Sequence, residues 1–188
     1  MKNKKIILSF EGPDNVGKGT QMKKVVAYFK DINFVCLYDS LKAGESDEEK
    51  VTYGKKREGI YFNVRNYLWE QNFPQINDRS HYSEYAYRMF RNSDKIDDLL
   101  ELEKKYINLS DDYLTLTFID NPENISKRDD GESAYKAEDL KSISGLIDRF
   151  KFISEKSIFE NYIIDINGKD EDEVFEIVLE KIKNKFDL

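Results

Sequence analysis

The sequence contains little cysteine, no surplus of positive charge and no long apolar run. Its single cysteine, Cys36, cannot form an intramolecular disulfide, and the apolar run at 34–38 around it predicts a buried, inert thiol. The net charge of −7 and the pI near 5.0 disfavour non-specific binding to nucleic acid polymers and to anionic membranes. The apolar stretch after the basic first residues stops at Glu11, which is too short for a signal peptide or a membrane span. We therefore expect a cytoplasmic protein without a nucleic acid polymer or a membrane as its main partner.

What the sequence does contain fits a folded domain. With 188 residues the chain can bury a sizeable core, and a single domain over residues 1–188 is expected. Apolar residues make up 39% of the chain, and 12 Phe and 12 Tyr supply the large buried surfaces that disordered chains lack.

Short apolar runs alternate along the chain with segments of helical periodicity. Strands are predicted at 5–10, 34–38, 73–77, 113–119 and 162–166. Helices are predicted at 20–30, 83–90, 96–107, 138–152 and 174–186, with 45–72 mostly helical. This order predicts an α/β fold with a central parallel sheet of about five strands and helices on both faces.

A glycine turn joins the first predicted strand to the first helix. Residues 12–20 read GPDNVGKGT and match G-x-x-x-x-G-K, the spacing of a phosphate-binding loop (P-loop), whereas a plain turn would bind nothing. Backbone N–H groups of such a loop turn inward, and the following helix directs its free amides at a phosphate. Lys18 would then bridge the β- and γ-phosphate oxygens of ATP. The ATP site is predicted to comprise Gly12, Asn15, Val16, Gly17, Lys18, Gly19, Thr20 and Gln21.

The loop departs from the usual pattern at one position. Gly19 follows Lys18, where such loops carry the Ser or Thr hydroxyl that binds Mg²⁺, so Thr20 is the nearest replacement.

Three segments, taken in order, carry the pattern of a known family. FEGPDNVGKGTQ at 10–21 is similar to F-E-G-x-D-x-x-G-K-x-T-Q, and DRSHYSEYAY at 78–87 is similar to D-R-x-x-x-S-x-x-A-Y. IDNPE at 119–123, followed by Lys127 and Arg128, is similar to a strand and helix that lead into a lid. These are the motifs of the thymidylate kinase family, which the chain resembles, while the GKGTQ ending also resembles adenylate kinase.

The resemblance implies a P-loop kinase fold, with ATP over the loop and a deoxynucleoside monophosphate beneath a short lid at about 126–137. It implies that Lys18 holds the transferring phosphates and that Asp78, with Thr20, organises Mg²⁺ and its waters. Arg79 would hold the acceptor phosphate, and Arg128 would close on ATP from the lid.

The resemblance also implies an acceptor site. Asp14 matches an aspartate that contacts the acceptor sugar, and the family has an aromatic residue four places before an arginine. Two pairs fit, Tyr53 with Arg57 and Tyr61 with Arg65, and the spacing to Asp78 favours the first. The predicted acceptor site comprises Asp14, Tyr53, Arg57, Arg79, Ser83, Glu84 and Tyr87.

Two features are expected to have no role in the chemistry. His81, the only histidine, is predicted to be a solvated loop residue, because transfer to an existing phosphate oxygen needs little help from a base. The acidic run at 129–132 lies where a lid would be expected to carry arginines, and can be an exposed turn.

Three functions stay open, with a nucleotide kinase that acts on dTMP favoured. A deoxynucleoside kinase would need a carboxylate base near the end of the second strand, where Asp39 lies, and a regulator would bind nucleotide without transfer. Glu84 lies near the expected base position, where a carboxylate would accept a hydrogen bond from an exocyclic amine. ATP, Mg²⁺ and a deoxynucleoside monophosphate are the expected ligands, and a homodimer is the expected assembly.

Overall fold

The structure, a computed structural model, describes residues 5–38, 62–89, 96–128 and 139–188. Within these residues, five parallel strands form one sheet with the spatial order β2-β3-β1-β4-β5. The strands are β1 (Ile7–Glu11), β2 (Val35–Tyr38), β3 (Gln75–Asp78), β4 (Tyr113–Ile119) and β5 (Asn161–Asp165). The predicted α/β class with a central parallel sheet is therefore confirmed.

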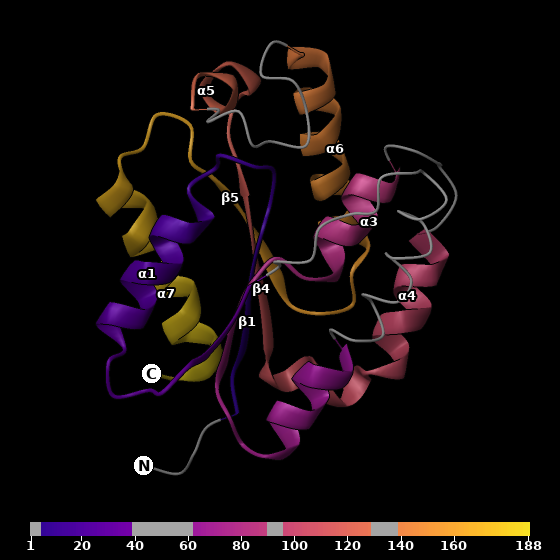
Figure 1. The fold of residues 1–188 in the computed structure, drawn as a ribbon, viewed down its shortest axis with the longest axis vertical. Coiled ribbons are helices and arrows are strands. Elements are labelled where there is room, and N and C mark those ends of the chain that lie inside the picture. The colour runs from indigo at the N-terminus through magenta and orange to yellow at the C-terminus, as the bar shows by residue number, and fades with distance from the viewer. Residues whose placement is uncertain (1–4, 39–61, 90–95, 129–138) are drawn as a thin grey trace.

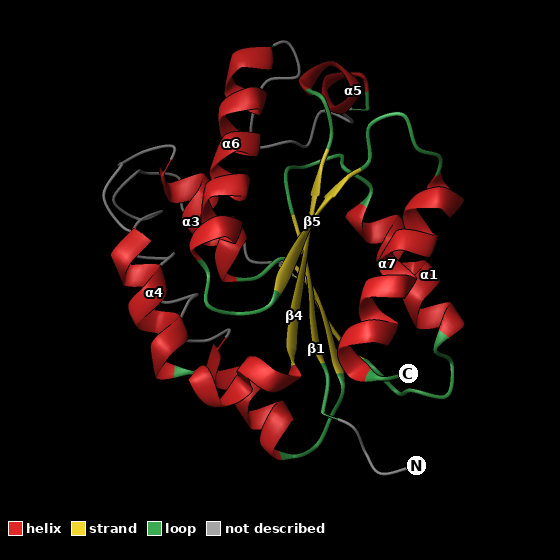
Figure 2. Ribbon diagram, turned by 180° about the vertical axis from the view of Figure 1, so that it is seen from behind, coloured by secondary structure: helices red, strands yellow, loops and turns green. Residues whose placement is uncertain are grey.

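Helices cover both faces of this sheet (Figure 1). They are α1 (Lys18–Tyr28), α3 (His81–Met89), α4 (Ile96–Lys105), α5 (Pro122–Lys127), α6 (Leu140–Lys156) and α7 (Glu171–Phe186), with a 3-10 helix η1 (Ile107–Asp112) and a helical stretch at 62–70. α1 and α7 pack together on one face, and α3, α4 and α6 lie on the other (Figure 2). None of the described helices is long and apolar enough to cross a membrane.

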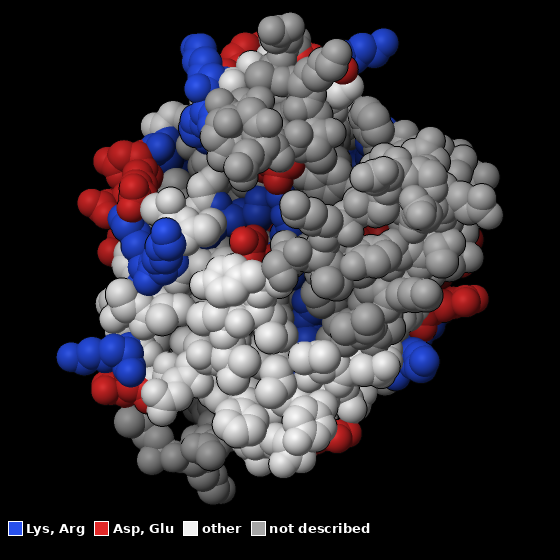
Figure 3. Space-filling model, viewed as in Figure 1, with Lys and Arg blue, Asp and Glu red and all other residues white. Residues whose placement is uncertain are grey.

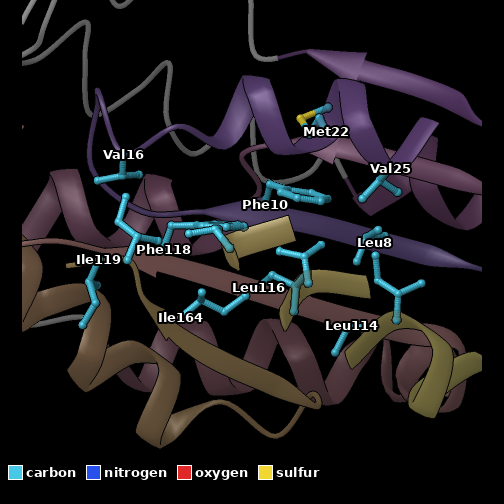
Figure 4. Packing of buried hydrophobic residues seen from close by; sticks show 14 of the residues in the cluster. Leu8, Phe10, Val16, Met22, Val25, Leu114, Leu116, Phe118, Ile119 and Ile164 are labelled. Atoms are coloured by element: carbon cyan, nitrogen blue, oxygen red, sulfur yellow. The ribbon is translucent and has the colours of Figure 1, made fainter. Parts of the chain in front are cut away.

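The face under α1 and α7 carries the main apolar core (Figure 4). Leu8 and Phe10 of β1 and Leu116 and Phe118 of β4 are completely buried there. The rings of Phe10 and Phe118 stack with their centroids 5.5 Å apart. Each such side chain stabilises the fold by about 1.5–3 kcal/mol, so this core fixes β1 firmly between its neighbours.

The opposite face of the same strands is polar although it is equally buried. Its inward residues, each 0% exposed, are Ser9, Glu11, Gln75, Asn77, Thr115 and Thr117. The Ser9 hydroxyl lies 2.8 Å from the Tyr113 hydroxyl, and Asn77 Nδ2 donates to the Leu8 carbonyl at 3.1 Å. Such partners offset the cost of burying polar groups, so this face is ordered by hydrogen bonds as well as by packing.

The chain changes direction across the sheet at β1. After β1 it builds β2 and β3 on one side, and then β4 and β5 on the other side. Ligands of open parallel sheets bind at the carboxyl ends of the strands next to such a switch point. The residues that follow β1, β3 and β4 therefore share the expected site.

Several element boundaries differ from the sequence-based expectation. The third strand begins at Gln75, because Phe73 lies before it and is exposed. The helix predicted at 96–107 ends at Lys105, and η1 then extends to Asp112. Cys36 is half-buried and not fully buried as predicted. Residues 45–61 lie outside the described residues, and 62–70 are helical as expected.

Candidate active site

The loop between β1 and α1 has the backbone shape that an anion cradle requires. Gly12 has φ +129°, and a Cβ there would overlap the Phe118 carbonyl oxygen of β4. Asn15 and Gly17 also have positive φ values, 62° and 78°. Val16 is 1% exposed and anchors the loop in the core. Only glycine fits position 12, so the glycine is explained by close strand approach as well as by backbone freedom.

Lys18 begins α1 and folds back over the loop. Its Nζ donates to the carbonyl oxygens of Gly12 at 3.1 Å and Pro13 at 2.6 Å, and the residue is 6% exposed. The first turn of α1 has free backbone amides and the positive end of the helix dipole. A lysine ammonium beside the N-terminus of a helix is an arrangement that suits a phosphate chain.

The pKa of Lys18 is lowered to about 7, first by burial and then by the neighbouring positive charge of Arg79. Asp14, Asp78 and Glu11 oppose this shift with their negative charges. An anion placed beside Lys18 would raise the pKa again, because it favours the charged form.

Arg79 is the second cation of the site and is held by several partners. It follows β3 and has φ +69°, a conformation that costs energy for a non-glycine residue. Its Nη1 donates to the Gly12 carbonyl at 3.1 Å and to the Ser83 hydroxyl at 3.1 Å, and its Nη2 pairs with Asp14 Oδ1. The Tyr87 hydroxyl donates to Asp14 Oδ2 at 3.1 Å, and the Arg79 guanidinium lies 5.3 Å from the Tyr87 ring centroid.

The charge of this cluster is balanced within the site. Burial alone would lower the pKa of Arg79, but the neighbouring Tyr87 and the carboxylates of Asp14, Asp78 and Glu11 raise it well above the ordinary value. Figure 3 shows basic and acidic side chains adjoining near the middle of one face of the molecule. Arg79 therefore stays charged and is available for an anionic acceptor group.

Asp78 has a free acceptor suited to a hydrated Mg²⁺ ion. It is the last residue of β3, and its Oδ1 is buried without a hydrogen-bond partner among the described residues. Thr20 lies on the exposed side of the first turn of α1. The described residues contain no cluster of three or more His, Cys, Asp or Glu side chains that could hold a metal ion.

Arg128 lies on the other side of the P-loop. Its Nη1 donates to the Asn15 carbonyl at 3.1 Å, and its Nη2 pairs with Asp120, whose side chain is fully buried. Asn124 Nδ2 donates to Asp120 Oδ1 at 3.1 Å. The arginine predicted to close on ATP is thus fixed at the loop's outer edge.

The structure brings most of the predicted residues to one end of the sheet. Gln21 is buried, and its Nε2 donates to the Glu171 carbonyl at 3.0 Å, which ties α1 to α7. Glu84 is half-buried in the first turn of α3. Of the two aromatic–arginine pairs, Tyr53, Arg57 and Tyr61 lie outside the described residues, as does Asp39.

Arg65, the arginine of the second pair, is completely buried. It donates from Nε to Asn77 Oδ1 at 3.1 Å and from Nη2 to the Arg79 carbonyl at 3.3 Å. In this position Arg65 holds the backbone of Arg79 through its carbonyl group.

The expectation for His81 is wrong. It begins α3 and is 0% exposed, with Nε2 2.8 Å from Glu103 Oε1 and Nδ1 3.2 Å from the Ser80 hydroxyl. Burial raises the pKa of Glu103, but hydrogen bonds from His81, Ser157 and the Ile158 backbone outweigh it and lower that pKa. The mistake arose because a lone histidine after a strand gives no sign of a carboxylate 22 residues further along the chain.

Sequence reasoning also missed Glu11 and Asp120 as parts of the site. Both are buried carboxylates at strand ends, Glu11 at the end of β1 and Asp120 directly after β4. The signal was present, because an acidic residue at the end of a buried strand needs a buried donor.

The fold and the site define an α/β protein with a phosphate-binding loop at the switch point of a parallel sheet. No family model matches the sequence, and no curated protein matches it. Solved structures match its fold. A thymidylate kinase from Candida albicans superposes with a TM-score of 0.67 and 20% identity, covering 94% of this chain and 90% of that one.

Two further solved structures are similar over nearly their full length. The YorR protein of Bacillus subtilis, solved in complex with phosphorylated GDP, gives a TM-score of 0.62 and 18% identity, covering 96% of this chain and 98% of that one. A thymidylate kinase from Ehrlichia chaffeensis gives 0.62 and 17%, covering 95% and 98%. The chain thus has the fold of these proteins, and the predicted P-loop kinase fold is confirmed.

Proposed function

We propose that this protein transfers the γ-phosphoryl group of ATP to a deoxynucleoside monophosphate, with dTMP as the favoured acceptor. The observation that carries the proposal is the joint placement of Lys18 and Arg79. Both cations lie at the carboxyl end of the central strands, and both donate to the Gly12 carbonyl, at 3.1 Å in each case. One can hold the donor phosphates while the other holds the acceptor phosphate.

The donor half uses the P-loop. Its inward amides and the N-terminus of α1 would bind the β-phosphate, and Lys18 would bridge the β- and γ-oxygens. Asp78 would hold Mg²⁺ through its free Oδ1 and through water. When bound, Mg²⁺ supplies positive charge at the oxygens that gain charge during transfer. Arg128 would fix the nucleotide at the loop's outer edge.

The acceptor half uses the cluster around Arg79. The planar guanidinium suits a phosphate, and Asp14 and Tyr87 lie beside it, where they would contact the acceptor sugar. Phosphoryl transfer to a phosphate oxygen needs positioning and charge more than a base. The site offers those two properties.

The preference for one nucleobase of the acceptor would depend on Glu84. A carboxylate near the base would favour an exocyclic amine over thymine, and the YorR neighbour was solved with a guanine nucleotide. We expect Glu84→Gln to change the ratio of kcat/KM values across the four deoxynucleoside monophosphates. Unchanged ratios would remove Glu84 from the base site.

Two other functions would give different results in one experiment. A deoxynucleoside kinase, with Asp39 as base, would release ADP with deoxynucleosides, and a regulator would show turnover with no acceptor. We therefore propose to measure ADP release with Mg·ATP and each of the four deoxynucleosides and the four monophosphates. Turnover only with monophosphates is expected, and Asp14→Asn should lower it mainly through the acceptor KM.

The control for this assay lies on the same helix as Lys18. Lys24 is a half-buried partner of Glu171 and Asp172 outside the proposed site, so Lys24→Met should keep wild-type turnover whereas Lys18→Met should lose it. A homodimer and a cytoplasmic location are also proposed, and light scattering on the purified protein tests the first.

A further inference from the structure

We propose that Glu11 is a positioning residue that holds Arg79 in the acceptor site through the hydroxyl of Ser83. This inference rests on the proposed function for its catalytic consequence, but its structural content stands on the contacts themselves. Glu11 ends β1, is 0% exposed and directly precedes the P-loop. It is the last member of the buried polar row on the second face of the sheet.

The carboxylate of Glu11 accepts four hydrogen bonds from the start of α3. Oε1 accepts from the Ser80 backbone N–H at 2.7 Å and from the Ser80 hydroxyl at 2.5 Å. Oε2 accepts from the Ser83 backbone N–H at 3.1 Å and from the Ser83 hydroxyl. Four donors surround one acceptor group, and the positive end of the α3 dipole adds to them, so a buried negative charge is well compensated.

These bonds determine which groups donate and which accept between Glu11, Ser83 and Arg79. A serine hydroxyl has one hydrogen, and Ser83 donates that hydrogen to Glu11. Its oxygen is then left to accept, and Arg79 Nη1 donates to it at 3.1 Å. The guanidinium is therefore fixed to the body of the sheet through a hydroxyl whose orientation Glu11 sets.

The backbone of Arg79 is held from the same side. Its own N–H donates to the Phe10 carbonyl at 2.9 Å, one residue before Glu11, and its carbonyl accepts from Arg65. Ser80, the next residue, is pinned to Glu11. Together these contacts hold the left-handed conformation at Arg79, which would otherwise relax.

A hydrogen-bonded pair, His81 and Glu103, also supports Ser80. His81 contacts the Ser80 hydroxyl and Glu103, and Glu103 accepts from the Ser157 hydroxyl at 2.7 Å and the Ile158 N–H at 2.8 Å. The start of α3 is thereby connected to α4 and to the chain after α6. The segment that carries the two serine partners of Glu11 is therefore itself held by contacts with other elements.

Glu11→Gln tests the proposal with little change of shape. A glutamine amide cannot accept from both serines, because its NH₂ group would face the donors of one of them. We expect kcat/KM for the acceptor to fall about 10- to 100-fold, as for loss of hydrogen bonds to a charged group, with KM for ATP within about threefold. Ser83→Ala should give the same split, and Ser83→Thr, which keeps the hydroxyl, should restore the acceptor KM.

The matched control removes a buried helix hydroxyl that packs against the same face of the sheet and does not contact Arg79. Ser154→Ala deletes the 3.1 Å contact with the Thr117 hydroxyl and should leave both KM values unchanged. If Glu11→Gln and Ser83→Ala raise the two KM values equally, or act no more strongly than Ser154→Ala, the positioning role is refuted. Ser83→Ala decides the matter if Glu11→Gln does not fold.

A readout without turnover separates this inference from the proposed function. The guanidinium NMR signal of Arg79, assigned by its loss in Arg79→Lys, should show slowly rotating Nη groups in wild type and in Ser154→Ala. In Ser83→Ala and Glu11→Gln these groups should rotate and exchange faster. If wild type transfers phosphate to no acceptor, the proposed function fails, whereas an unchanged Arg79 signal in both variants overturns the positioning role itself.

Discussion

The lowered pKa of Lys18 predicts that ATP binding takes up a proton. With a pKa of about 7, only about 3% of Lys18 is charged in the free protein at about pH 8.5. A phosphate charge about 4 Å away, at an effective dielectric constant of about 20, favours the ammonium by about 4 kcal/mol. That is about a thousandfold tighter proton binding, so Lys18 should be almost fully charged in the complex.

Titration calorimetry with a non-hydrolysable ATP analogue measures this proton. The binding enthalpy at about pH 8.5, plotted against the ionisation enthalpies of several buffers, should have a slope of about 0.9 proton per nucleotide. Lys18→Met should bring the slope close to zero. Lys24→Met should keep it, because hydrogen bonds with Asp172 and Glu171 raise the pKa of Lys24, which stays charged throughout. A wild-type slope below about 0.3 would refute the reasoning. It would mean that the charge of Lys18 does not change when the nucleotide binds.

Three further predictions concern stability and the donor site. The folded pKa of Lys18, about 7, lies below the ordinary lysine value of 10.5, so the unfolded chain binds more protons between these values and stability should rise with pH there. Lys18→Met should remove this dependence and raise the free energy of unfolding at pH 7 by about 2–4 kcal/mol in urea titrations, while transfer is lost. Gly12→Ala should cost at least about 2 kcal/mol in the same titration, because the new Cβ meets the Phe118 carbonyl; an unchanged midpoint would contradict this. Asp120→Asn should raise KM for ATP about 10-fold and leave the acceptor KM unchanged, because it frees Arg128 from its buried partner; equal changes in both values would count against it.

The phosphate loop could be predicted from sequence because its requirements are local. Glycine spacing, a buried strand before it and a helix after it are all read from about 25 consecutive residues. The pairing of Asp78-Arg79 with this loop required one more step. Parallel register places Phe10 opposite Asp78, so the residues that follow the two strands meet. The resemblance to the thymidylate kinase family predicts that Asp78 and Arg79 lie beside the loop without knowledge of the strand order.

The buried polar residues that hold the site in place could not be predicted from sequence in the same way. Ser9, Gln75 and Asn77 are polar residues that lie fully inside, so hydrophobic periodicity misplaces them. Glu11 and His81 are buried because partners from distant elements satisfy them, and only tertiary structure brings those partners together. The sequence therefore indicates the residues proposed to bind ligand more readily than the residues that hold them in place.

The charges of the proposed site suit a small polyanion, although the protein as a whole is acidic. The chain carries a net charge of −7, yet two cations, Lys18 and Arg79, are buried within reach of the same carbonyl oxygen. Their mutual repulsion helps to lower the pKa of Lys18, and the carboxylates of Asp14, Asp78 and Glu11 limit the effect. Of these three, Glu11 accepts hydrogen bonds from the start of α3, whereas Asp78 Oδ1 has no hydrogen-bond partner within the described part of the chain. An anionic phosphate chain relieves the repulsion between the cations, and a bound cation at Asp78 relieves the opposite repulsion between that carboxylate and the phosphates. The site is therefore complete only with both charges present, which is the physical reason to expect ATP to bind as its magnesium complex.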